Sequence, residues 1–154
     1  MDGSKPLPAF DDDYLLWAKA QAAAIRARDW DAVDLERVAE EIESLGGSER
    51  REMENQLIRL IEHRLKLDHG LNREPERQWG LSVRTQQRSL NRLFRKMPSL
   101  RSELSEAIAE IYGDARVMAM DSFKTYEPER ADHYESALPR TCPYTSAYLL
   151  DPQP

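Results

Sequence analysis

Three side chains have types and spacing that could hold a metal ion. Glu40 and Glu43 lie three residues apart in a segment with helical apolar periodicity, so they share one face, and His63 follows in a later segment. Carboxylate and imidazole groups from neighbouring helices hold metal ions in some helical bundles, but those bundles use a Glu-x-x-His motif that this chain lacks. The favoured interpretation is that the glutamates pair with arginines and that His63 makes a hydrogen bond.

Lys66 is a candidate for ligand binding. It follows His63 by three residues, so a helix places both side chains on one face, where they could bind an anion. The alternative is that the aliphatic stem of Lys66 covers the core while its ammonium reaches water, which is the favoured interpretation.

Trp79 is a second candidate for the binding surface. Together with Trp17 and Trp30 it could form an aromatic cluster around a ligand. Tryptophans in separate segments more often fill the core with one ring edge exposed, and core packing is therefore the expectation.

Arginines recur along one side of the segment after Trp79. Arg84, Arg88, Arg92 and Arg95 follow one another at spacings of four, four and three residues, which suggests a groove for nucleic acid. Aromatic side chains do not alternate with them, as they would in a surface for single-stranded nucleic acid. The interpretation is a solvated face that is partly paired with acidic residues of the same chain.

Cys142 precedes a proline and a short helical segment, where a helix terminus could favour its thiolate. The sequence supplies no defined base for it, so a small apolar side chain is the favoured role. With one cysteine, no disulfide can form within the chain, which is usual for a reducing compartment.

Composition places the chain among single-domain helical proteins. It has 154 residues, of which 32% are charged, and a formal net charge of -6, which disfavours nucleic acid as the main partner. The first thirteen residues contain no apolar segment typical of a secretory signal, and no apolar run is long enough to span a bilayer. We therefore expect a cytoplasmic protein without a membrane-spanning segment.

Opposite charges are concentrated in different segments. Residues 29–54 hold ten acidic and three basic side chains, whereas residues 71–101 hold eight basic and two acidic ones. The acidic second helix and the basic helix over residues 79–96 would gain electrostatic energy by lying close together.

Apolar residues recur at helical spacing along most of the chain, and no segment alternates with the period of a strand. The pattern predicts helices over residues 14–28, 35–67, 79–96 and 99–122, with Gly46 and Gly47 either ending or bending the second helix. The predicted apolar stripes of the first two segments are Leu15, Ala18, Ala22 and Ile25, then Leu35, Val38, Ile42 and Leu45.

These elements predict an all-α fold, an antiparallel bundle of about four main helices with a short C-terminal helix over residues 144–150. Residues 53–67 are apolar around a wide arc and should form the most buried element. We expect residues 1–10 to be a flexible leader and residues 11–151 to form a single domain.

Several short motifs together resemble the bacterial DUF29 family. The resemblance covers about residues 10–151, and it implies a compact helical fold without assigning a catalytic residue or a cofactor. The segments that carry it include Asp13-Tyr14-Leu15-Leu16-Trp17, Ala39-Glu40-Glu41-Ile42-Glu43-Ser44-Leu45-Gly46, His63-Arg64-Leu65-Lys66, Pro98-Ser99-Leu100 and Cys142-Pro143-Tyr144.

The resulting expectation is a non-catalytic protein-binding or adaptor module that uses a protein partner or self-association and needs no cofactor. A metal-binding bundle or enzyme using Glu40, Glu43 and His63 is the first alternative. An antitoxin-like or nucleic-acid-associated protein is the second. The sequence identifies no small-molecule ligand.

Overall fold

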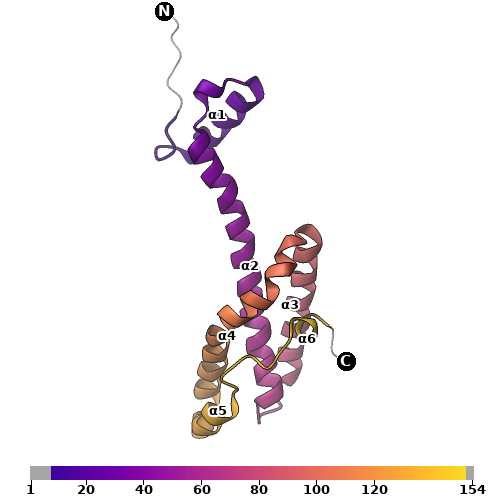
Figure 1. Cartoon of the computed structure of the whole chain (residues 1–154). Coiled ribbons are helices and arrows are strands. Elements are labelled where there is room, and N and C mark those ends of the chain that lie inside the picture. Colours follow the sequence, from indigo (N-terminus) through magenta and orange to yellow (C-terminus); the bar gives the residue numbers. More distant parts are fainter. Residues whose placement is uncertain (1–7, 152–154) are drawn as a thin grey trace, which may run out of the picture. The chain divides into compact units, whose positions relative to one another are not determined.

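The computed structural model describes residues 8–151, and that range contains helices and no strand (Figure 1). The all-α prediction is confirmed. Residues 1–7 of the expected leader lie outside the described range. The helices are α1 (Tyr14–Ala27), η1 (Trp30–Ala32), α2 (Leu35–His69), α3 (Glu76–Lys96), α4 (Ser99–Tyr126), η2 (Pro128–Arg130), α5 (Ala131–Ala137) and α6 (Ser146–Leu150).

The chain divides into two compact units, residues 1–48 and 49–154. The first unit contains α1, η1 and the start of α2. The second contains the remainder of α2 and all later helices. One domain over residues 11–151 stays a prediction.

Helix α2 continues through Gly46 and Gly47 without ending. Glycine lowers helix stability by about 1 kcal/mol relative to alanine, but it keeps the backbone N–H that proline would remove. A Cβ atom at Gly46 would meet no atom within 4 Å, so close packing does not explain this glycine. The division between the two units follows one residue after Gly47.

The first unit buries a different face of α1 from the one predicted. The Asp13 carboxylate caps α1 by accepting a hydrogen bond from the Leu16 N–H at 2.9 Å. The buried residues of α1 are Trp17, Gln21 and Ala24, whereas Leu15 is 61% exposed. The prediction of Leu15, Ala18, Ala22 and Ile25 as the buried stripe is therefore wrong.

A buried glutamine explains which face of α1 turns inward. The Gln21 amide oxygen accepts a hydrogen bond from the Asp34 N–H at 2.7 Å, at the start of α2. Val33 is buried beside this connection. Because a polar side chain ties α1 to the next segment, apolar periodicity alone points to the wrong side of the helix.

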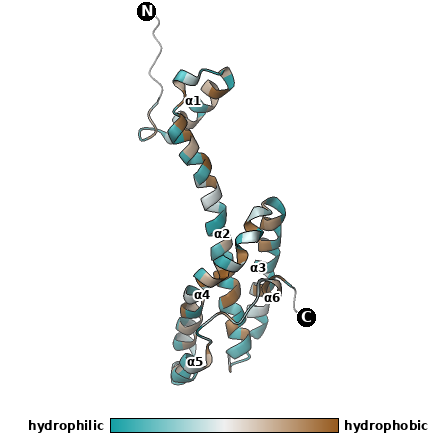
Figure 2. Ribbon diagram, in the orientation of Figure 1, coloured by the Kyte–Doolittle hydropathy of each residue, from teal (hydrophilic) through white to brown (hydrophobic). Residues whose placement is uncertain are grey.

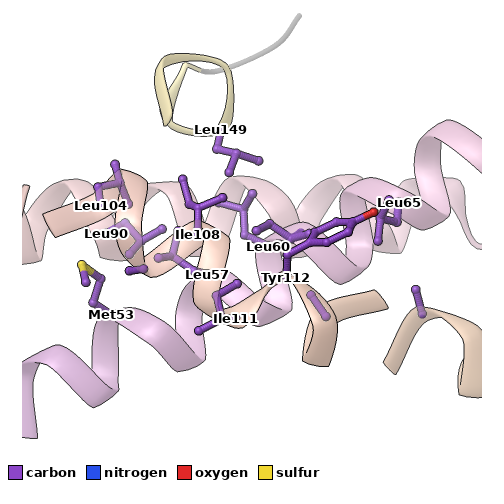
Figure 3. Close-up of a cluster of buried hydrophobic side chains, with 14 of the residues drawn as sticks. Met53, Leu57, Leu60, Leu65, Leu90, Leu104, Ile108, Ile111, Tyr112 and Leu149 are labelled. Carbon is purple, nitrogen blue, oxygen red and sulfur yellow. The ribbon is translucent and has the colours of Figure 1, made fainter. Parts of the chain in front are cut away.

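The second unit has a continuous apolar core between α2, α3 and α4 (Figure 3). Five side chains of α2 in this core are fully buried, and they lie on the segment predicted to be the most buried. That prediction is confirmed. The five are Met53, Leu57, Leu60, Ile61 and Leu65.

The C-terminal segment packs onto the same core. Leu149 of α6 points into it and is 1% exposed (Figure 3). Gln87 of α3 is buried and donates to the carbonyl oxygens of Leu149 and Asp151 at 2.9 and 3.0 Å. Tyr144 donates to a carboxylate oxygen of Asp68 at 2.8 Å. These hydrogen bonds fix a helix that is too short to be stable alone.

Arg50 of α2 pairs with three carboxylates, two of which belong to α4. Its guanidinium pairs with Glu54 at 2.9 Å and with Glu103 and Glu110 at 2.8 Å each. The hydrogen bonds to Glu54 and Glu110 raise the Arg50 pKa, which keeps the group protonated. Arg50, a basic residue of the predicted acidic helix, therefore pairs with acidic residues of α4. The sequence did not predict this pairing.

Substituting Leu60→Ala should lower the free energy of unfolding by about 2–5 kcal/mol, because the fully buried side chain leaves a cavity behind. Urea denaturation measures the change. Leu81 is 50% exposed on α3, so Leu81→Ala is the matched control and should cost less than about 1 kcal/mol. Equal losses in both variants would contradict the assigned core.

Candidate functional site

The second unit contains a pocket of about 370 Å³ that brings together three predicted residues, His63, Lys66 and Trp79. The end of α2, the start of α3 and the end of α4 form its walls. Sites for small ligands typically combine apolar and aromatic side chains with a few polar groups. The pocket is lined by His63, Lys66, Asn72, Pro75, Gln78, Trp79, Ser122, Phe123, Tyr126 and Glu127.

Lys66 is only 6% exposed and pairs with the buried carboxylate of Glu62 one helical turn earlier. The expectation that its ammonium reaches water is therefore wrong. Burial of both charges is costly unless they stay paired, so each side chain holds the other in place. Sequence reasoning missed Glu62, although its spacing of four residues from Lys66 is the signal for a helical ion pair.

The Trp79 ring lies over Lys66, with 5.9 Å between the Lys66 nitrogen and the ring centroid. Gly70 makes this approach possible. A Cβ atom at Gly70 would stand 2.5 Å from the Lys66 carbonyl oxygen and 3.1 Å from the Trp79 ring. Close packing between the end of α2 and the start of α3 thus requires glycine at this position.

His63 and Glu127 add polar groups to the wall. The His63 Nδ1 atom lies 2.8 Å from the Arg59 carbonyl oxygen, so Nδ1 donates and Nε2 carries the lone pair in a neutral ring. Glu127 is buried and accepts hydrogen bonds from Tyr134 at 2.9 Å and from Arg130 at 2.7 Å. Burial raises the Tyr134 pKa, so its hydroxyl remains a donor.

The predicted arginines do not line this pocket. Arg84 lines a second hollow with Arg64 and Arg77, Arg88 lines a third, and Arg92 is exposed. Within residues 8–151, none of Arg84, Arg88 and Arg92 forms an ion pair, whereas Lys96 of α3 pairs with Glu49 of α2 at 3.1 Å. These three side chains are exposed, and their expected partial pairing with acidic side chains of residues 29–48 stays a prediction.

The candidate metal ligands do not form one cluster. Glu40 lies in the first unit and pairs with Arg37 at 3.0 Å, Glu43 is exposed in the same unit, and His63 belongs to the second. Over the described part of the chain, no three His, Cys, Asp or Glu side chains are grouped so that they could hold a metal ion.

Comparison with known protein families identifies the family of the chain. The model of the family described as "Domain of unknown function DUF29" matches residues 9–153. The chain belongs to the DUF29 family. No curated protein and no solved structure matches it significantly.

Among residues 8–151 of this DUF29 chain, no helix is both long and apolar enough to cross a membrane.

The three tryptophans of the chain differ in their surroundings. Trp17 is 5% exposed, in agreement with the expected core role, and Trp79 is half-buried at the pocket. Trp30 is 56% exposed, so the expectation of core packing is wrong there.

Cys142 precedes α6 and is partly buried. Burial raises the pKa of its thiol, although a backbone hydrogen bond at Tyr144 acts in the opposite direction. The thiol also donates to the Tyr144 carbonyl oxygen, with 3.6 Å between Sγ and O. Burial in the fold of this DUF29 chain therefore favours the neutral thiol.

Removal of the Lys66 charge should destabilise the second unit. Lys66→Met leaves the Glu62 carboxylate buried without its partner, which should cost about 3–5 kcal/mol. The double variant Glu62→Leu with Lys66→Met should recover most of this loss in urea denaturation. Lys96 is exposed, so Lys96→Met is the control and should cost less than about 1 kcal/mol. Additive losses in the double variant would contradict the coupling.

Cys142 should react slowly with iodoacetamide at mildly alkaline pH. The raised pKa leaves less thiolate in the folded chain than in the unfolded chain, and the alkylation rate should rise as the pH approaches that pKa from below. Mass spectrometry measures the rates, with the urea-unfolded chain as the control. Faster alkylation of the folded chain would contradict burial of the thiol.

Proposed function

We propose that this protein is a protein-binding module whose first unit captures a basic, amphipathic segment of a partner protein. The observation that carries the proposal is the exposure of large apolar side chains in that unit. Figure 2 shows how hydrophobic residues alternate with hydrophilic ones along α1 and the start of α2. Residues 8–151 contain thirteen large hydrophobic side chains that are exposed, and eight of them lie between residues 14 and 45. They are Tyr14, Leu15, Leu16, Ile25, Trp30, Leu35, Ile42 and Leu45.

The start of α2 supplies an ordered part of this surface. Leu35, Val38, Ile42 and Leu45 are spaced by three, four and three residues, which places them along one side of the helix. Val38 is half-buried, whereas Ile42 and Leu45 are 64% and 69% exposed. An apolar stripe of this kind accepts the apolar face of another helix. Exposed apolar clusters of this extent mark interaction sites.

The charge of the first unit favours a basic partner. Residues 8–48 contain ten acidic and four basic side chains, an excess that equals the net charge of the whole chain, -6. A second copy of this unit would bring like charges together, whereas a basic segment would neutralise them. We therefore assign the surface to a different protein rather than to a second copy of the chain.

A helical peptide with one leucine face and one lysine face provides a direct test. The full chain should bind the labelled peptide saturably in fluorescence anisotropy, and a peptide with glutamate in place of lysine should not bind. Ile42→Lys should weaken binding by about tenfold or more, since it removes an apolar contact and repels the peptide.

Leu81→Lys is the matched control, because Leu81 is an exposed hydrophobic residue of the second unit. It should leave peptide binding unchanged. Equal weakening by Ile42→Lys and Leu81→Lys would contradict the assigned surface. Sedimentation of the wild type as a dimer that Ile42→Lys converts to a monomer would assign the surface to a second copy and overturn the proposal.

A further inference from the structure

The third hollow of the second unit, to which Arg88 belongs, is lined by three arginines. It has a volume of about 490 Å³ and lies where α3 turns into α4 at Pro98. The last turns of α3 contribute Arg88 and Arg95, and the first turn of α4 contributes Arg101. Asn91 and Phe94 complete the lining, which includes no carboxylate.

The positive charges around this hollow have no counterpart among the described residues. Arg88, Arg95 and Arg101 form no ion pair within residues 8–151. Nearby carboxylates are engaged elsewhere, since Glu49 pairs with Lys96 and Glu103 pairs with Arg50. Three like charges around one hollow repel one another unless an anion lies between them.

We propose that this hollow binds a compact anion that carries phosphoryl groups. Guanidinium groups match phosphate geometry because each can donate two parallel N–H bonds. The Asn91 amide offers a further N–H donor at the same lining. The first turn of α4 carries the positive end of a 28-residue helix, which favours the same sign of ligand charge.

The lining favours a small phosphorylated molecule over a nucleic acid strand. Phe94 is only 5% exposed, so it offers no ring face on which a base could stack. The chain as a whole is negative, which opposes a long polyanion more than a compact one. This ligand lies outside the proposed protein-binding function, because the hollow belongs to the second unit.

Pyrophosphate is the probe for a calorimetric titration of the full chain at a constant ionic strength of about 0.15 M, where surface charges are screened beyond about 8 Å. The wild type should bind saturably. Arg95→Gln and Arg101→Gln should each weaken binding by about tenfold or more, because each removes a charged hydrogen-bond donor. In NMR spectra, the Asn91 side-chain amide signal should shift with saturation.

Arg51→Gln is the control, because Arg51 is an exposed arginine of α2 that does not line the hollow. It should leave pyrophosphate affinity unchanged, and circular dichroism should give the same helix content for all variants. Absence of saturable binding, or equal affinity in Arg95→Gln and the wild type, would overturn the proposal. Tighter binding of a duplex RNA oligonucleotide than of pyrophosphate would also overturn the assignment to a compact anion.

Discussion

The buried stripe of α2 from Met53 to Leu65 is the constraint on which the second unit depends. Helices α3, α4 and α6 all place apolar side chains in the cluster that surrounds it (Figure 3). The same stripe determines the position of the pocket. Leu65 faces the core, and the next residue, Lys66, therefore lies at the edge of the core. Neighbouring side chains cover the aliphatic part of Lys66, so its ammonium group needs a partner within the protein. Glu62 meets that need one turn earlier.

Apolar periodicity predicted the helices, but it could not predict what covers them. Leu57 and Leu60 are fully buried, whereas Ile42 and Leu45 are exposed, although both pairs belong to helical stripes of the same kind. Apolar periodicity shows that a helix has one apolar side. That side is buried only where another element of the fold packs against it. In α1 the buried face includes the polar residue Gln21, which accepts a hydrogen bond that no apolar pattern encodes.

The candidate pocket was predictable only in part for a related reason. Lys66 and Trp79 attract attention by residue type and local spacing. Phe123 and Glu127 come from the end of α4 and reach the pocket through the packing of α4 against α2, which involves residues about sixty positions apart.

The charge of a segment did not predict its ion pairs. Arg50 of the acidic helix pairs with acidic residues of α4, whereas Arg88 of α3 has no acidic partner among the described residues.

The two units present chemically different surfaces, and the difference lies in the distribution of charge. The acidic excess of residues 8–48 accounts for the net charge of the whole chain, so the remainder is close to neutral and the arginines around Arg95 create a local positive field. Salt weakens the electrostatic attraction of a charged ligand or partner to both surfaces. The free energy gained by burying apolar side chains does not depend on this charge screening. A partner that covers Ile42 and Leu45 would therefore retain much of its affinity as salt rises, whereas an anion held by guanidinium groups would lose most of its own.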